Sequence, residues 1–209
     1  MHRNPLNPSP WVSMWSHPRS TLRTLLHENP RYGVFYLTLV YALDNLFYFA
    51  NWGSLGLSFP FSHLLIAILL LSPLIGFIWL YFTSALLFLT GKWLHGRSSF
   101  QGIVASLAWS KIPLSISLFM WFLLLVFHPD TVFILTPGPT TVFINFIGVI
   151  VGIWALVLLV QALQEVQGFS TGRSLANLFL ACLLSTFFSF LIFNLFDFIQ
   201  LTYHSLRFF

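Results

Sequence analysis

Residues Ser62–Thr90 read SHLLIAILLLSPLIGFIWLYFTSALLFLT, and this stretch decides the fold. It contains no Asp, Glu, Lys or Arg. A helix of about 20 apolar residues crosses the ~30 Å hydrocarbon layer of a bilayer, and it satisfies its own backbone hydrogen bonds there. The stretch therefore predicts a transmembrane helix.

Four further stretches of similar character lie on either side of it. Together the five predict an all-α polytopic membrane protein, a bundle of about five transmembrane helices preceded by an N-terminal amphipathic interfacial helix or helices. We expect residues 1–32 to form an N-terminal segment and residues 204–209 a short tail. The connectors between the spans are too short to hold a further domain. The predicted spans are residues 33–52, 62–90, 101–127, 141–166 and 174–203.

The composition indicates that lipid, rather than water, surrounds most of this chain. Hydrophobic residues make up 57% and charged residues 7% of the 209 positions, whereas a soluble domain has about 25% charged residues. The Lys and Arg residues are dispersed between apolar runs and form no basic stripe, which argues against nucleic acid as a partner. Cys182 is the single cysteine, so an intramolecular disulfide or a cysteine-based metal site is excluded.

Positive charge predicts the orientation of the chain, because Lys and Arg near span ends are retained on the cytoplasmic side. In a five-span chain only Arg207 falls on the side opposite to the other basic residues outside the spans. We therefore expect a cytoplasmic N-terminus and a C-terminus on the opposite side. The start of the chain lacks the apolar core of a cleavable signal peptide, so we expect the mature chain to begin near Met1. The residues on the predicted cytoplasmic side are Arg3, Arg19, Arg23, Arg31, Lys92, Arg97 and Arg173.

The segment before the first span has an amphipathic pattern. Trp11 and Trp15 share one helical face, and leucines further along form a second stripe. This pattern is typical of helices that lie in the membrane interface, with a break near Pro18. The candidate membrane-surface contacts are Trp11, Trp15, Arg19 and Arg23. The alternative is a cap helix that packs on the protein's own loops.

Two stretches resemble a known family. Residues 7–23 (NPSPWVSMWSHPRSTLR) are similar to the N-terminal signature of prokaryotic members of the Yip (Ypt-interacting-protein) domain family, in which Asn-Pro-Trp and a second Trp precede Pro-Arg-x-Thr. Residues 90–100 (TGKWLHGRSSF) and 108–113 (AWSKIP) resemble that family's glycine-containing turn and its proline-bearing third helix. The chain departs mildly from the pattern at His95–Ser98, where a Gly-Gly pair is common.

The resemblance implies five spans with the N-terminus inside, over nearly the whole chain, and a bacterial inner membrane. Eukaryotic relatives of this kind are associated with vesicle traffic and Rab-type GTPases. The acidic Asp-Leu-x-Gly-Pro motif of those relatives is absent from this sequence, so the resemblance does not imply that role here.

Ionisable residues inside the predicted spans are the candidates for a functional site, because a charge in the membrane is costly. Asp44 and Lys111 each lie about halfway along a span, so they could pair or line an ion path. Gln161 and Glu165 form a polar cluster at the cytoplasmic end of the fourth span, which is either a gate or an ordinary helix end. The candidate polar site comprises Asp44, Lys111, Glu165 and Gln161, with Asp197 nearer the far surface.

Prolines and glycines inside the spans predict bends and close packing. Pro73 and Pro113 each remove a backbone donor, so both helices are expected to kink, with nearby serines as replacement donors. Gly148 and Gly152 form a Gly-x-x-x-Gly pair that allows close approach of another helix, in this chain or in a second copy.

We find no catalytic motif, no metal-ligand spacing and no cofactor signature in the sequence. The sequence therefore favours a non-enzymatic membrane-organising or partner-binding protein of an adaptor-like kind. The expected partners are membrane lipids and a second copy or another membrane protein. The alternatives are a small transporter or channel that uses Asp44 and Lys111, and an intramembrane lipid-modifying enzyme.

Overall fold

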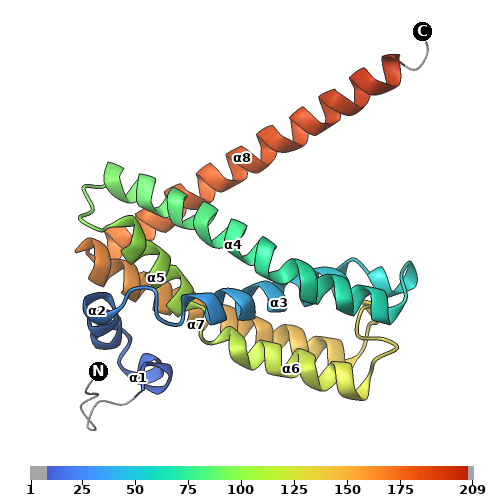
Figure 1. The fold of residues 1–209 in the computed structure, drawn as a ribbon, viewed down its shortest axis with the longest axis horizontal. Helices are drawn as coiled ribbons and strands as arrows, with labels where there is room; N and C mark the ends of the chain where they lie inside the picture. Colours follow the sequence, from blue (N-terminus) through green and yellow to red (C-terminus); the bar gives the residue numbers. More distant parts are fainter. Residues whose placement is uncertain (1–8, 207–209) are drawn as a thin grey trace.

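The computed structural model describes residues 9–206, without the side chains of Thr140 and of residues 196–206. The described chain is all-helical, as predicted (Figure 1). The predicted tail therefore lies partly outside the described residues, and so do Arg3, Arg207 and the side chain of Asp197. The helices are α1 (Pro10–Ser16), α2 (Pro18–Glu28), α3 (Val34–Trp52), the short 3₁₀ helix η1 (Leu55–Leu57), α4 (Phe61–Trp93), α5 (Phe100–Ser110), α6 (Leu114–Phe127), α7 (Pro139–Gln167) and α8 (Thr171–Leu206).

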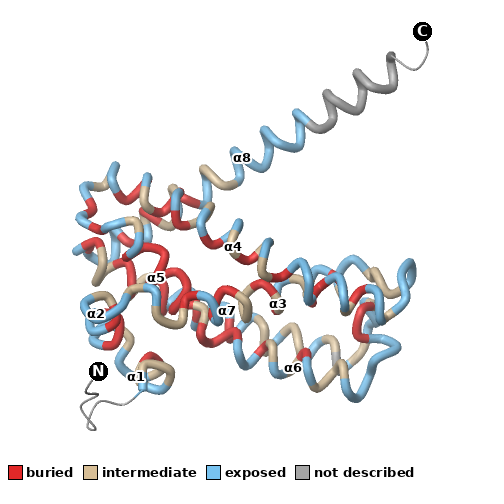
Figure 2. Tube along the Cα trace, viewed as in Figure 1, coloured by how far each residue is buried: buried red, intermediate tan, exposed pale blue. Residues whose placement is uncertain are grey.

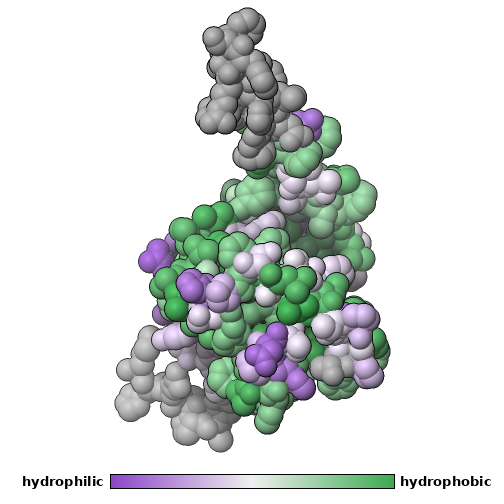
Figure 3. All heavy atoms as spheres, turned by 90° about the vertical axis from the view of Figure 1, so that its right-hand side faces the viewer, coloured by the Kyte–Doolittle hydropathy of each residue, from purple (hydrophilic) through white to green (hydrophobic). Residues whose placement is uncertain are grey.

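Four long helices, α3, α4, α6 and α7, run along a common direction and form the bundle (Figure 1). Their connectors gather at two ends. One end, which we call the basic end, holds α1, α2, the α4–α5 loop and the α7–α8 turn. The other, which we call the far end, holds residues 53–60 and 128–138. Seen from the far end, the surface is mostly apolar with a few hydrophilic groups (Figure 3).

The short helix α5 lies at the centre of the basic half of the bundle. Every residue from Gly102 to Ser110 is buried, and Figure 2 shows the helix as a continuous buried segment. Its small residues let α2, α3, α4 and α7 pack around it, and the Ser99 hydroxyl caps its first turn by accepting the Gly102 N–H at 3.1 Å. A helix of this kind is positioned by protein on all sides rather than by lipid.

The predicted third span is broken at its proline. Helices α5 and α6 meet at an angle of 47°, and the break comprises Lys111, Ile112 and Pro113. The Trp109 carbonyl, which Pro113 deprives of its helical donor, accepts the Ile112 N–H at 3.3 Å instead. At Pro73 the helix continues, and the Ser72 hydroxyl donates to the freed Leu69 carbonyl at 3.1 Å.

By length and apolarity alone, three helices of the described chain can cross a membrane, or four if the bent α5–α6 pair is one span. The three are α4, α7 and α8, so the protein is an integral multi-pass membrane protein. Helix α3 has 19 residues, about the length that a crossing needs, but it carries more polar side chains than the others. The predicted number of five is therefore approximate, with α3 as the fifth candidate.

Helix α8 leaves the bundle at the basic end and diverges from α4 along its length (Figures 1 and 2). Only 6% of its most apolar described window is buried inside the protein. Because its exposed side chains are large and apolar, this helix is suited to lipid contact.

Candidate functional site

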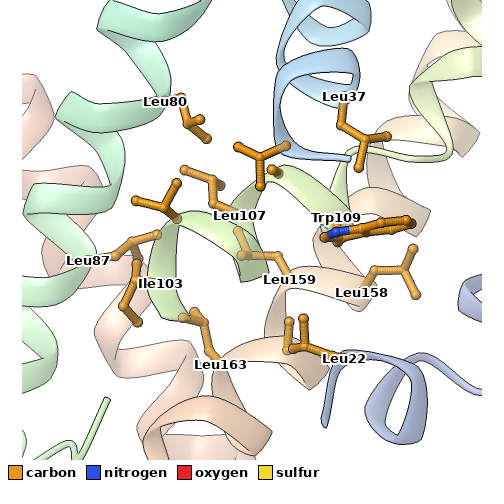
Figure 4. Close-up of a cluster of buried hydrophobic side chains, with 14 of the residues drawn as sticks. Leu22, Leu37, Leu80, Leu87, Ile103, Leu107, Trp109, Leu158, Leu159 and Leu163 are labelled. Atoms are coloured by element: carbon orange, nitrogen blue, oxygen red, sulfur yellow. The ribbon is translucent and has the colours of Figure 1, made fainter. Parts of the chain in front are cut away.

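The basic end is built on the two N-terminal helices, which are anchored to the bundle by buried side chains. Met14 of α1 and Leu22 of α2 are 1% and 0% exposed, respectively. Figure 4 shows Leu22 pointing toward Leu158 and Leu163 of α7, below Trp109 of α5. The N-terminal segment is therefore part of the same hydrophobic core as the central helix.

The two tryptophans predicted as membrane-surface contacts pack against aromatic residues of the bundle. The Trp11 ring lies 5.0 Å from the Trp109 ring, and the Trp15 ring lies 5.9 Å from the Trp154 ring. Trp109 also donates its indole N–H to the Tyr32 carbonyl at 3.1 Å. This geometry corresponds to the cap-helix alternative, and lipid contact by the remaining exposed edges stays a prediction.

Arg19 and Arg23 of α2 contact the end of α7. The Arg23 Nε atom donates to the Glu165 carboxylate at 2.7 Å, and Arg19 donates to the Gln164 side chain. The hydrogen bond to Glu165, together with its charge, raises the pKa of Arg23 above its ordinary value. The Arg23 side chain is still 67% exposed, so this end presents positive charge to its surroundings. The exposed basic residues here are Arg19, Arg23, Arg31, Lys92, Arg97 and Arg173.

A tight polar junction joins α4, α7 and α8 at the same end. The buried Gln167 side chain lies against Gly91 and Gly96, where any Cβ atom would overlap its amide group. Beside it, the buried Thr90 hydroxyl meets the Asn177 side-chain oxygen at 2.5 Å. The sequence did not predict Gln167 as a packing residue. Its two glycine neighbours, Gly91 and Gly96, lie inside residues 90–100, which resemble the family's glycine-containing turn.

The predicted polar site separates into two places in the structure. Glu165 and the half-buried Gln161 lie on α7 toward the basic end, whereas Asp44 lies in the middle of α3. Asp44 is 3% exposed and accepts a hydrogen bond of 2.6 Å from the Ser117 hydroxyl of α6. Trp121, one turn along α6, directs its buried indole toward the same carboxyl.

Lys111 and Asp44 form no direct ion pair. Across the described side chains, the Arg23–Glu165 contact is the single ion pair within 4.0 Å. The Lys111 ammonium instead lies over the Tyr41 ring, 4.9 Å from its centroid, in a cation–π contact. Tyr41 stands one turn before Asp44, so the two ionisable groups are neighbours without touching.

Asp44 belongs to a polar stripe on α3 that sequence reasoning missed. The residues recur at intervals of three or four, which places them on one helical face. The signal was in the sequence, because this spacing interrupts an otherwise apolar span. The stripe comprises Thr38, Tyr41, Asp44, Tyr48 and Asn51.

Two small cavities flank this stripe. One of about 100 Å³ opens near the far end, and Asn51, Trp121, His128 and Asn145 are among its lining residues. The other, of about 40 Å³, touches Thr38, Tyr41 and Lys111. A water molecule occupies about 30 Å³ of liquid volume, so both cavities are large enough to hold water.

The two glycines of the predicted Gly-x-x-x-Gly pair have different surroundings. A Cβ atom at Gly148 would overlap the Tyr48 hydroxyl, whereas a Cβ at Gly152 would meet no described atom within 4 Å. A further glycine-mediated helix contact lies at Gly76 of α4, where a Cβ would lie 2.8 Å from the Ala42 Cβ of α3. Association of Gly152 with a second copy stays a prediction.

Among the side chains that the structure describes, no three of His, Cys, Asp or Glu come together in a way that could hold a metal ion. Comparison with known proteins gives one match, to the Yip1 domain family model, over residues 12–193. No curated protein and no solved structure matches the chain. The matched region runs from within α1 to within α8 and includes Trp15, the glycine turn and the broken third span. The chain therefore belongs to the Yip1 domain family.

Proposed function

We propose that this protein is a non-enzymatic, membrane-organising or partner-binding protein that acts through its basic end. The observation that carries the proposal is the docking of α1 and α2 onto the bundle. Buried Met14 and Leu22 fix these helices, so their arginines form a preorganised surface rather than a free tail.

The charges of this surface favour an anionic partner. Six exposed Lys and Arg side chains gather at the basic end, while Glu165 is largely occupied by Arg23. Acidic protein segments and anionic lipid headgroups both carry the complementary charge, and each basic residue near an anionic bilayer contributes about 1 kcal/mol. This end is proposed to face the cytoplasm, because basic residues near span ends are retained there.

A shallow groove at the basic end provides a place for such a partner. It lies between α2, the start of α5 and the end of α7, and is lined by Arg23, His27, Gln101 and Glu165 among others. Because the groove combines elements from three parts of the sequence, its shape depends on the docking of α2.

The test is a comparison of the wild-type protein with the Arg97→Gln, Arg173→Gln double variant, both reconstituted in vesicles with and without anionic lipid. Neither side chain anchors the core, since both are exposed. We expect the variant to lose association with acidic ligands, measured by cross-linking in native membranes and by lipid selectivity in the vesicles.

The matched control is Asp130→Asn, which changes an exposed charge at the far end. It should leave both readouts unchanged. Identical cross-linking and identical lipid selectivity for the wild type and the double variant would refute a role for the basic end.

Transport of a solute has less support in this conformation. The two cavities along α3 measure about 100 and 40 Å³, and Asp44 is not among the residues that line either of them. If the protein were a transporter, purified protein in vesicles would show flux that Asp44→Asn abolishes.

A further inference from the structure

We infer that the Asp44 carboxyl is a proton-binding site inside the bundle, which exchanges with the far end through a polar cavity. This inference is independent of the proposed role of the basic end, because Asp44 lies in the middle of α3 and not among the residues of that surface.

The carboxyl has a built environment of hydrogen-bond donors. The Ser117 hydroxyl donates to Oδ1 at 2.6 Å. The Trp121 indole is 1% exposed, is directed at the same carboxyl and has no hydrogen-bond partner in the described structure. A buried N–H group without a hydrogen-bond partner is unfavourable. The Asp44 carboxyl is an acceptor that this indole can approach.

The charges that face Asp44 do not neutralise it directly. Tyr41 and Tyr48 flank it on α3, and Lys111 approaches from the α5–α6 break but rests on the Tyr41 ring. From α6 the side chains are Ser117 and Trp121, which carry no charge. An ionised carboxylate in a membrane interior needs a partner. A bound proton removes that requirement without any rearrangement.

A polar cavity lies next to the Asp44 site on its far-end side. The far-end cavity of about 100 Å³ shares Trp121 with the Asp44 site and is lined by polar groups that include Asn51, His128 and Asn145. Waters held by such groups can pass a proton. Trp121 borders both the Asp44 site and this cavity, and we place the exchange route along it.

The experiment is infrared difference spectroscopy of the full-length protein in lipid, recorded during a pH titration. We expect a carbonyl stretch of a protonated carboxylic acid that is lost at alkaline pH. Asp44→Asn should remove this band completely. Glu165→Gln, which changes a carboxyl at the basic end, should leave it in place. A wild-type spectrum without an Asp44 band at any pH at which the protein stays folded would overturn the proposal.

Two further variants keep the test decisive if Asp44→Asn fails to fold. Ser117→Ala removes the hydrogen bond to Oδ1, so it should shift the band to higher frequency. Lys111→Met should retain the wild-type band. If the band appeared only in Lys111→Met, Asp44 would be the ionised partner of Lys111 and the proposal would be wrong.

Access from the far end is tested by transfer to D₂O. The band should shift promptly to its deuterated position if the carboxyl exchanges through the far-end cavity as proposed. A band that stays protonated over hours would show a sealed site and would contradict the exchange route.

Discussion

Glu165 illustrates what sequence reasoning can predict about a single residue and what it cannot. Its position near a helix end could be inferred from the sequence, but its partner could not. The partner in the structure is Arg23, on a helix for which the sequence predicted contact with the membrane surface. An ion pair of this kind depends on how distant helices pack together, and the local sequence pattern does not show that.

For Asp44, the sequence predicted the burial of the side chain but not its hydrogen-bond partner. The sequence identified it as a buried carboxyl from its depth in the span, and it is buried. Its expected pairing with Lys111 depended on equal depth alone. The break at Pro113 places Lys111 over the Tyr41 ring instead, and Ser117 takes the position of hydrogen-bond donor.

A residue-scale prediction follows from the Gln167 junction. Gly91→Ala should lower stability by about 1–3 kcal/mol, because the new Cβ would overlap the buried Gln167 amide and force it out of its present position. The measurement is thermal unfolding of the detergent-solubilised protein. Gly172→Ala is the control, since a Cβ there meets no described atom within 4 Å. Equal melting temperatures of the two variants would show that the close contact between Gly91 and Gln167 does not contribute to stability.

At the scale of elements, the long apolar helices could be predicted from the sequence. The broken span formed by α5 and α6 could be predicted only in part. Length and hydropathy define α4, α7 and α8, since lipid imposes both. The proline predicted a bend in the third span. That α5 is enclosed by protein was not predictable, because its small residues match both lipid-facing and buried positions.

Docking of α2 is an element-scale prediction. Leu22→Ala removes a fully buried side chain from the shared core and should weaken the docking by about 2–5 kcal/mol. Limited trypsin digestion should then cleave at Arg19 and Arg23 faster than in the wild type. The control is Val12→Ala, an exposed position on α1 that should digest like the wild type. Unchanged cleavage of Leu22→Ala would indicate that α2 is held by other contacts.

The α3–α4 contact provides a second element-scale prediction. Gly76→Ala places a Cβ 2.8 Å from the Ala42 Cβ, so the two helices must separate, and stability should fall by about 1–3 kcal/mol. Gly152→Ala is the matched control inside another span, because its position is open. Chemical denaturation in a mixed micelle gives the comparison. A larger loss in Gly152→Ala would instead favour packing of that face against a second copy.

At the scale of the whole molecule, the bundle has two chemically different ends. Basic side chains, the docked N-terminal helices and the glycine turn lie at one end, and the polar cavity lies at the other. Family membership and the apolar helices establish a multi-pass membrane protein. The polarity of the ends supports the basic end as the cytoplasmic one.

The most direct test of this account is cysteine accessibility in intact cells, in a Cys182→Ala background that removes the single native cysteine. Cysteines introduced at Ser20 and Ser170 report on the basic end, and those at Ser58 and Thr131 report on the far end. The account predicts that a membrane-impermeant maleimide labels Ser58→Cys and Thr131→Cys from outside, and labels Ser20→Cys and Ser170→Cys only after permeabilisation. Labelling of both pairs from the same side would contradict it.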